Sequence, residues 1–317
     1  MLPPDADRAD PRVGDSSRWF RSPVVAGIRF TRSMIAFLGL TSALIYGASD
    51  FFCGLGSRRV TALVVSFISQ IAALVIATIA TLSSQQHWST SAVVLGLVAG
   101  IGGGIGTWAF FTSLAIGPMS VVSPGVAMIY AVVPAIVGIA LGERIAPLGY
   151  LALVAVVVAA VLLAIPRQRD AARLTPQAIV YGSIAGLGYA GYIIAIGRTP
   201  RDSGLVPLWI DLIVASLIYT VALLVNRVRR GTGELRGFRD RTAVVQSILA
   251  GVLLAGGNIL LVIGLHLGEL AVMGVLNALY PLGTVILAFV IVKERLSWLQ
   301  IAGVALALGA SAVLALV

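Results

Sequence analysis

The chain of 317 residues is 59% hydrophobic and only 11% charged, whereas soluble domains carry about 25% charged residues, so a soluble globular protein is excluded. The net charge of +9 suggests a nucleic-acid partner at first sight, but the basic residues lie almost wholly in the N-terminal region and in loops, where they would anchor the chain at lipid headgroups. We therefore expect no nucleic acid as a partner. A single cysteine, Cys53, excludes an intramolecular disulfide and a cysteine-based metal cage.

Residues 1–33 form a separate region with scattered prolines, six arginines and four aspartates. This composition predicts a disordered basic tail. The region has no apolar core of a secretory signal followed by a cleavage site, so we expect the first hydrophobic run to remain as a membrane helix.

Ten apolar runs follow, each long enough to cross a hydrocarbon core, which takes about 20 residues in a helix. They lie near 34–57, 60–82, 92–115, 119–142, 145–165, 178–197, 205–225, 243–265, 270–292 and 296–317. The runs are continuous and lack the alternation of a barrel strand, which indicates helices. We predict an all-α membrane protein with ten transmembrane helices.

A polar linker, Pro166 to Pro176, divides the runs into two sets of five, over residues 34–166 and 177–317. Because five is odd, the second set must enter the membrane upside down, which gives an inverted repeat with both termini on one side. A shift of 151 positions places Gly100 on Gly251 and Gly106 on Gly257, and it also aligns Glu143-Arg144 with Glu294-Arg295. Paired repeats of this kind are typical of transporters.

The first run carries a charged residue, Asp50, inside a membrane helix, where charge is costly. Its helical face carries Ser42, Tyr46, Asp50 and Cys53. This stripe predicts the wall of a polar pathway, in which Asp50 binds a cation or takes up and releases a proton. The alternative is that Asp50 pairs with Arg58 or Arg59 at the membrane interface.

Asp211 is the second acid inside a run, two residues after Trp209. The other positions on its helical face are apolar or glycine, so its own helix offers no polar stripe. This pattern favours an aspartate at the membrane interface beside an aromatic-belt tryptophan, with a loop arginine as its partner.

Further pathway residues are expected in the duplicated runs. Thr107 and Asn258 are equivalents under the 151 shift, and we expect Trp108 and Asn258 to line the pathway. Runs 119–142 and 270–292 contain Pro124, Pro134 and Pro281, which should kink or interrupt these helices near a binding site. The remaining candidates are Ser123, Tyr130, Asn277 and, in run 178–197, Tyr189. Plain packing is the alternative for each, and it is the favoured role of the glycines that recur in these helices.

The five-helix duplication, the stretch Tyr46-Gly47-Ala48-Ser49-Asp50, the stretch Leu114-Ala115-Ile116-Gly117 and the two Glu-Arg closures resemble the EamA group of the drug/metabolite transporter superfamily over residues 34–317. The resemblance implies a secondary transporter of small metabolites, often an exporter, in the cell membrane with both termini cytoplasmic. The charges disagree on this last point. With the termini inside, the inside segments would hold nine basic residues and the outside segments thirteen, which is the reverse of the positive-inside rule.

We expect the substrate to be a neutral, zwitterionic or cationic metabolite or drug, because no lysine or arginine lies at a span centre to bind a multiply charged anion. Glu143, Arg144, Glu294 and Arg295 are expected to act as gates or caps on opposite membrane faces. No motif of a nucleophile turn or a metal cluster is present in the sequence, so we expect neither an enzyme nor a cofactor. A scaffold or regulatory subunit is the open alternative, and the featureless runs 145–165 and 296–317 face lipid or a second copy in a homodimer.

Overall fold

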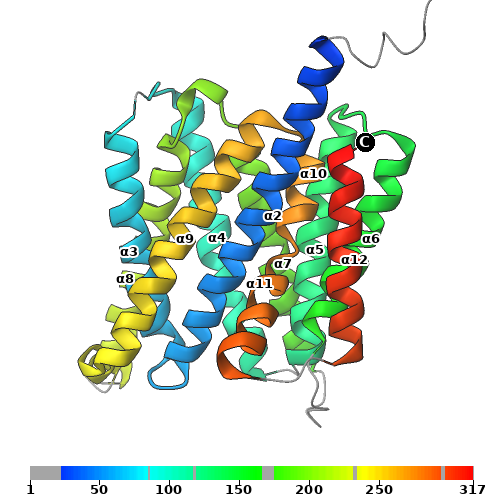
Figure 1. The fold of residues 1–317 in the computed structure, drawn as a ribbon. Coiled ribbons are helices and arrows are strands. Elements are labelled where there is room, and N and C mark those ends of the chain that lie inside the picture. The colour runs from blue at the N-terminus through cyan, green and yellow to red at the C-terminus, as the bar shows by residue number, and fades with distance from the viewer. Residues whose placement is uncertain are drawn as a thin grey trace, which may run out of the picture.

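The computed structural model describes residues 23–84, 86–116, 119–165, 175–230, 234–293 and 297–316. Within them the chain is a bundle of antiparallel helices (Figure 1). Its helices are α2 (Pro23–Ser57), α3 (Ala62–Leu82), α4 (Thr90–Ile116), α5 (Met119–Ala140), α6 (Pro147–Ala164), α7 (Pro176–Gly197), α8 (Val206–Arg230), α9 (Arg241–Leu267), α10 (Leu270–Asn277), α11 (Tyr280–Leu287) and α12 (Trp298–Leu316). Short 3-10 turns cover Arg201–Ser203 and Glu234–Arg239, and a π turn over Ala288–Val292 extends α11.

Seven segments of the described chain are long and apolar enough to cross a membrane. They are Ser33–Ser57, Ala62–Leu82, Thr90–Phe110, Pro176–Gly197, Val206–Arg229, Arg241–Leu267 and Leu270–Val292. Three shorter apolar helices, Gly125–Ala140, Pro147–Leu163 and Trp298–Leu314, coincide with the remaining expected runs. An all-helical membrane fold is therefore established, whereas ten crossings in two inverted repeats stay a prediction.

Helix boundaries differ from the expected ones in two places. The first helix already begins at Pro23, inside the region expected to be a tail. The run 270–292 is interrupted between Asn277 and Tyr280, as expected, with Pro281 in the first turn of α11, where its missing N–H is tolerated. Residues Met119–Ala140 form one helix, so neither proline in that run interrupts it.

Local chemistry fixes where the central helices begin. The Thr175 hydroxyl accepts a hydrogen bond from the Ala178 N–H, and Pro176 occupies the first turn of α7. The Asp240 carboxylate accepts from the Ala243 N–H at 2.9 Å and caps α9 in the same way. These caps satisfy backbone N–H groups that have no partner within the helix and fix the residues at which α7 and α9 begin.

The packing partners of the helices exchange between the two halves. Helix α4 packs on α7 and α8, whereas α9, its counterpart under the 151 shift, packs on α2 and α3. Likewise α5 packs on α7, and α10 and α11 pack on α2. Helices α6 and α12 pack on each other. The first half is thus held against the second by matching pairs of contacts.

Glycines permit the closest of these approaches. A Cβ at Gly100 on α4 would lie 2.6 Å from the Cβ of Val214 on α8, and one at Gly251 would collide with the Ser69 carbonyl on α3. Both positions therefore need glycine for helix packing, as expected for small-residue faces in membranes.

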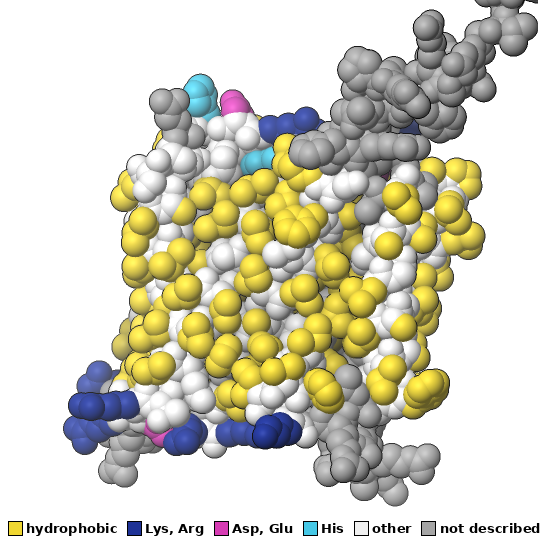
Figure 2. Space-filling view, in the orientation of Figure 1, with side chains coloured by type: hydrophobic (Ala, Val, Ile, Leu, Met, Phe, Trp, Pro, Cys, Tyr) yellow, Lys and Arg dark blue, Asp and Glu magenta, His cyan; other side chains and the backbone are white. Residues whose placement is uncertain are grey.

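The surface has the character of a membrane-spanning bundle. Figure 2 shows a broad apolar band, with the charged and histidine side chains gathered at its two edges. Among the described residues, large hydrophobic side chains such as Phe37, Leu151 and Val154 are more than 60% exposed, as suits a surface in contact with lipid. Helix α2 begins and α12 ends on the same side of the bundle (Figure 1).

Candidate substrate pathway

A network of buried polar side chains lies at the centre of the apolar bundle. The Asn258 side-chain oxygen on α9 accepts hydrogen bonds from two phenols, Tyr46 on α2 and Tyr192 on α7, the latter at 2.8 Å. Three helices from both halves of the chain therefore meet at one amide. Leaving such groups unpaired in a membrane interior would be costly, so the network fixes how these helices pack.

A second group of polar residues lies beside the first. Tyr130 on α5 donates to the Asn277 oxygen at 2.7 Å, and the Asn277 amide nitrogen donates to Ser42 at 2.9 Å. Ser42 in turn donates to the carbonyl of Gly257 at 2.9 Å. Asn277 is the last residue of α10, so the interruption of this helix lies directly at the network.

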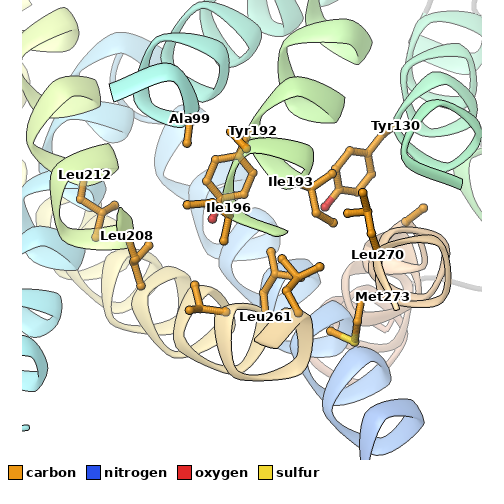
Figure 3. Packing of buried hydrophobic residues seen from close by; sticks show 14 of the residues in the cluster. Ala99, Tyr130, Tyr192, Ile193, Ile196, Leu208, Leu212, Leu261, Leu270 and Met273 are labelled. Atoms are coloured by element: carbon orange, nitrogen blue, oxygen red, sulfur yellow. The ribbon is translucent and has the colours of Figure 1, made fainter. Parts of the chain in front are cut away.

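Tyrosine rings connect the network to α4. Tyr189 on α7 donates to the Thr107 hydroxyl at 3.2 Å, and its ring meets that of Tyr130 edge-on with the centroids 6.2 Å apart. The surroundings are apolar: Figure 3 shows Tyr130 and Tyr192 among Ile193, Leu261 and Met273. Aromatic rings with a few polar groups are the side-chain types that proteins use to bind small organic molecules.

Asp50 is exposed, although it lies within a membrane span of α2. It is within electrostatic reach of Tyr46 and also of Tyr189, which belongs to α7. Its carboxylate has neither a hydrogen bond nor an ion pair with the described residues, and Arg59 pairs with Asp240 at 3.7 Å. Among the described residues Asp50 therefore pairs with neither Arg58 nor Arg59, the two partners of the interfacial alternative.

The expectation for Asp211 is also wrong. Asp211 is only 4% exposed, and within the described chain it makes no ion pair with an arginine. It lies against α4, where a Cβ at Gly103 would be 3.7 Å from its Oδ1 and 3.6 Å from the Tyr192 ring. Its neighbour Trp209 instead donates to the Thr78 hydroxyl at 2.8 Å. The acid is missed from the sequence because the polar neighbours belong to other helices and α4 contributes only a glycine.

One expected pathway residue, Trp108, is not part of this network. Trp108 is 50% exposed and contacts the edge of the Tyr181 ring, so the structure places it apart from the central tyrosines. The side chain of Ser123 lies outside the part of the chain that the structure describes. Tyr192, which follows Tyr189 by three residues on the same helical face, is a further member of the network through its hydrogen bond to Asn258.

The first Glu-Arg closure joins the two halves of the chain. The Glu143 carboxylate accepts hydrogen bonds from the backbone N–H groups of Leu270 and Ala271, at 2.7 and 2.9 Å. It thereby caps the N-terminus of α10, where the helix dipole favours a negative charge. Arg144 is exposed. Glu294 and Arg295 lie outside the described residues.

The described residues hold no cluster of three or more histidine, cysteine or acidic side chains that could bind a metal ion. The polar groups present are instead suited to hydrogen bonding and to neutralising a cation.

Comparison with known proteins assigns the family. The model of the EamA-like transporter family matches residues 176–316. The matched residues coincide with the second of the two expected five-helix sets. The expected resemblance is confirmed, and with the seven apolar spans it makes the chain a multi-pass membrane protein related to drug/metabolite transporters.

A solved crystal structure supports the fold over both halves. It shares 18% sequence identity with this chain, covers 88% of it and 95% of its own length, and superposes with a TM-score of 0.71. At this identity the likeness concerns the fold alone. No curated protein matches the sequence.

Proposed function

We propose that this EamA-like protein is a secondary transporter of small neutral, zwitterionic or cationic metabolites or drugs. The observation that carries the proposal is the network of Tyr46, Tyr130, Tyr192, Asn258 and Asn277, which lies in an apolar bundle and draws on helices of both halves. Polar groups at the centre of a membrane bundle are rare and mark substrate pathways in membrane proteins. The family is one of transporters, which supports a role without catalysis.

Alternating access around this centre is the proposed mechanism. Support comes from the exchange of packing partners, in which α4 with α7 corresponds to α9 with α2, as two inverted repeats would require. The interruption after Asn277 places a discontinuous helix at the network. Broken helices at binding sites are typical of transporters. We propose that the two halves rock around the network and that transport runs outward, from the cytoplasm.

Asp50 is the proposed site of proton coupling. Its carboxylate has no basic partner among the described side chains, and it lies within electrostatic reach of two tyrosines of the pathway, Tyr46 and Tyr189. A carboxylate in this position can carry a proton in one half of the cycle and release it in the other.

Glu143 is the proposed gate on the side where α10 begins. Its two hydrogen bonds to α10 tie the end of α5 to the second half, and rocking of the halves would have to break them. Charge-assisted bonds to a helix N-terminus are strong enough to hold a conformation and weak enough to exchange.

The test of the transport function is flux through the purified protein in liposomes, with a pH gradient and a panel of radiolabelled amines, amino acids and neutral metabolites. We expect accumulation of at least one substrate, which stops when the gradient is collapsed. A folded protein that moves no member of the panel would favour the alternative, a membrane scaffold or regulatory subunit in which α6 and α12 contact a second copy.

A further inference from the structure

Asp211 is a buried acid that the proposed mechanism leaves unused. It is 4% exposed on α8, and among the described residues no donor or cation bonds its carboxylate. A buried carboxylate without a partner is stable only when a proton or another cation neutralises it. The fold therefore keeps a site for a positive charge at this position.

The surroundings of Asp211 show what approaches it. Helix α4 presents Gly103, where a Cβ would lie 3.7 Å from the Asp211 Oδ1 and 3.6 Å from the Tyr192 ring, so no side chain of that helix separates the two groups. Tyr192 in turn donates its hydroxyl to Asn258, so Asp211 is one residue removed from the central network. Aromatic faces beside a carboxylate attract an organic cation through both the charge and the ring quadrupole.

Asp50 and Asp211 share a neighbour. Both acids act electrostatically on Tyr46, which lies in the network between α2 and α9. The other titratable groups facing Asp211 are Tyr192 from α7 and Tyr219 from its own helix. Helices α3 and α4 contain no titratable residue at all. The described lysines and arginines lie at helix ends, so nothing positive offsets the two acids.

We propose that Asp211 is a second cation-binding carboxylate of the pathway and that the transported substrate is a monovalent organic cation. The cation takes the place of the proton on the Asp211 carboxylic acid; the acid's O–H bond breaks, the carboxylate keeps the electron pair and the proton leaves to water. This proposal rests on the proposed transport function and narrows its substrate class from neutral, zwitterionic or cationic solutes to cations.

Binding to the purified full-length protein in detergent tests the inference without transport. Benzyltrimethylammonium is the probe, and benzenesulfonate, an anion of similar size, is its control. We expect the wild type to bind the cation with release of protons into a weakly buffered solution and to ignore the anion. In Asp211→Asn the affinity should fall at least tenfold and the protons released per bound cation should fall. Ser216→Ala, which removes another buried polar side chain from α8, should leave both unchanged.

A labelling experiment covers the case in which Asp211→Asn does not fold. Dicyclohexylcarbodiimide reacts with a protonated carboxylic acid in an apolar site: the acid's proton moves to one carbodiimide nitrogen and the carboxyl oxygen bonds to the central carbon. The acyl group then migrates from that oxygen to a nitrogen, which leaves a stable N-acylurea that mass spectrometry locates. We expect wild-type Asp211 to be labelled and benzyltrimethylammonium, but not benzenesulfonate, to protect it. Absence of the adduct, or labelling unaffected by the cation, would overturn the inference.

The two proposals can fail separately. Cation-protected labelling of Asp211 in a protein that moves nothing across liposomes would refute transport and keep the cation site. Active transport with unchanged cation binding and proton release in Asp211→Asn would refute the cation site and keep transport.

Discussion

Thr107 and Asn258 lie 151 positions apart, and each accepts a hydrogen bond from a tyrosine of the opposite half of the chain. Tyr189 on α7 donates to Thr107 on α4, and Tyr46 on α2 donates to Asn258 on α9. The preceding residue is a glycine in both cases, and a Cβ there would lie 3.2 Å from the ring of the donating tyrosine. The two contacts are therefore counterparts, although Asn258 accepts a second phenol, that of Tyr192.

The difference between these counterparts predicts unequal stability losses. Replacing Asn258 by leucine leaves two phenols without their acceptor, whereas Thr107→Val leaves one. Because each buried unpaired group costs about 1–3 kcal/mol, Asn258→Leu should lower the melting temperature in detergent roughly twice as much as Thr107→Val. Thermal unfolding followed by fluorescence-detected gel filtration measures both. Adding Tyr46→Phe to Asn258→Leu should restore part of the loss, and equal melting temperatures for the two single variants would contradict the assignment.

Gly47 is predicted to be intolerant of any side chain. A Cβ there would collide with the Tyr280 carbonyl and lie 2.7 Å from the Cα of Gly283, so α2 and α11 would be forced apart. The Thr284 hydroxyl, which donates to the Gly47 carbonyl at 2.9 Å, would be displaced as well. Gly47→Ala should reduce the yield of folded protein and lower its melting temperature.

The matched control is Gly54→Ala on the same helix, where a Cβ would have no heavy atom within 4 Å. Alanine is favoured over glycine in a helix by about 1 kcal/mol, so this variant should be as stable as the wild type or more so. Equal behaviour of the two variants would show that the close approach of α2 and α11 is absent.

Glu143→Ala should destabilise the first turn of α10. It removes the acceptor of two backbone N–H groups at that helix N-terminus, where charged acceptors contribute about 1.5–3 kcal/mol each. Hydrogen exchange of the first turn of α10, followed by mass spectrometry, should rise strongly, and uptake in one direction should change more than in the other. Arg144→Gln, at the exposed neighbouring position, should alter neither quantity. Unchanged exchange in Glu143→Ala would refute the cap.

Asp50→Asn should separate gradient-driven accumulation from exchange. Without the carboxylate no proton can be carried, so uptake driven by a pH gradient should fall to background, while counterflow of labelled against unlabelled substrate continues. Both are measured in the same liposomes. Full gradient-driven uptake by this variant would exclude Asp50 as the coupling residue and leave coupling to another group.

The sequence predicts the helical runs well because their length and apolarity are properties of each segment alone. It also predicts Tyr46, Asn258 and Asn277, since each is polar within an apolar run. It fails for Asp211 because burial there is produced by α4 and α7, and a pattern along α8 contains no information about either. The presence of proline is also insufficient to predict where a helix is interrupted. Pro281 lies in the first turn of a new helix, but the prolines of α5 lie within a continuous one.

The family resemblance and the charge distribution disagree about the orientation of the chain in the membrane. We predict cytoplasmic termini. The only cysteine is Cys53, so Cys53→Ser gives a background without thiols. Thr61 is exposed before α3, and its side chain makes no capping bond, whereas Ser84 is exposed after α3, on the side where α2 begins.

In intact cells a membrane-impermeant maleimide should label Thr61→Cys in that background and should label Ser84→Cys only after permeabilisation. The reverse pattern would show that the thirteen basic residues of the other face govern the topology, as the positive-inside rule would have it. The Glu143 cap would then lie on the outer face of the membrane, and the proposed direction of proton-driven transport would have to be reversed.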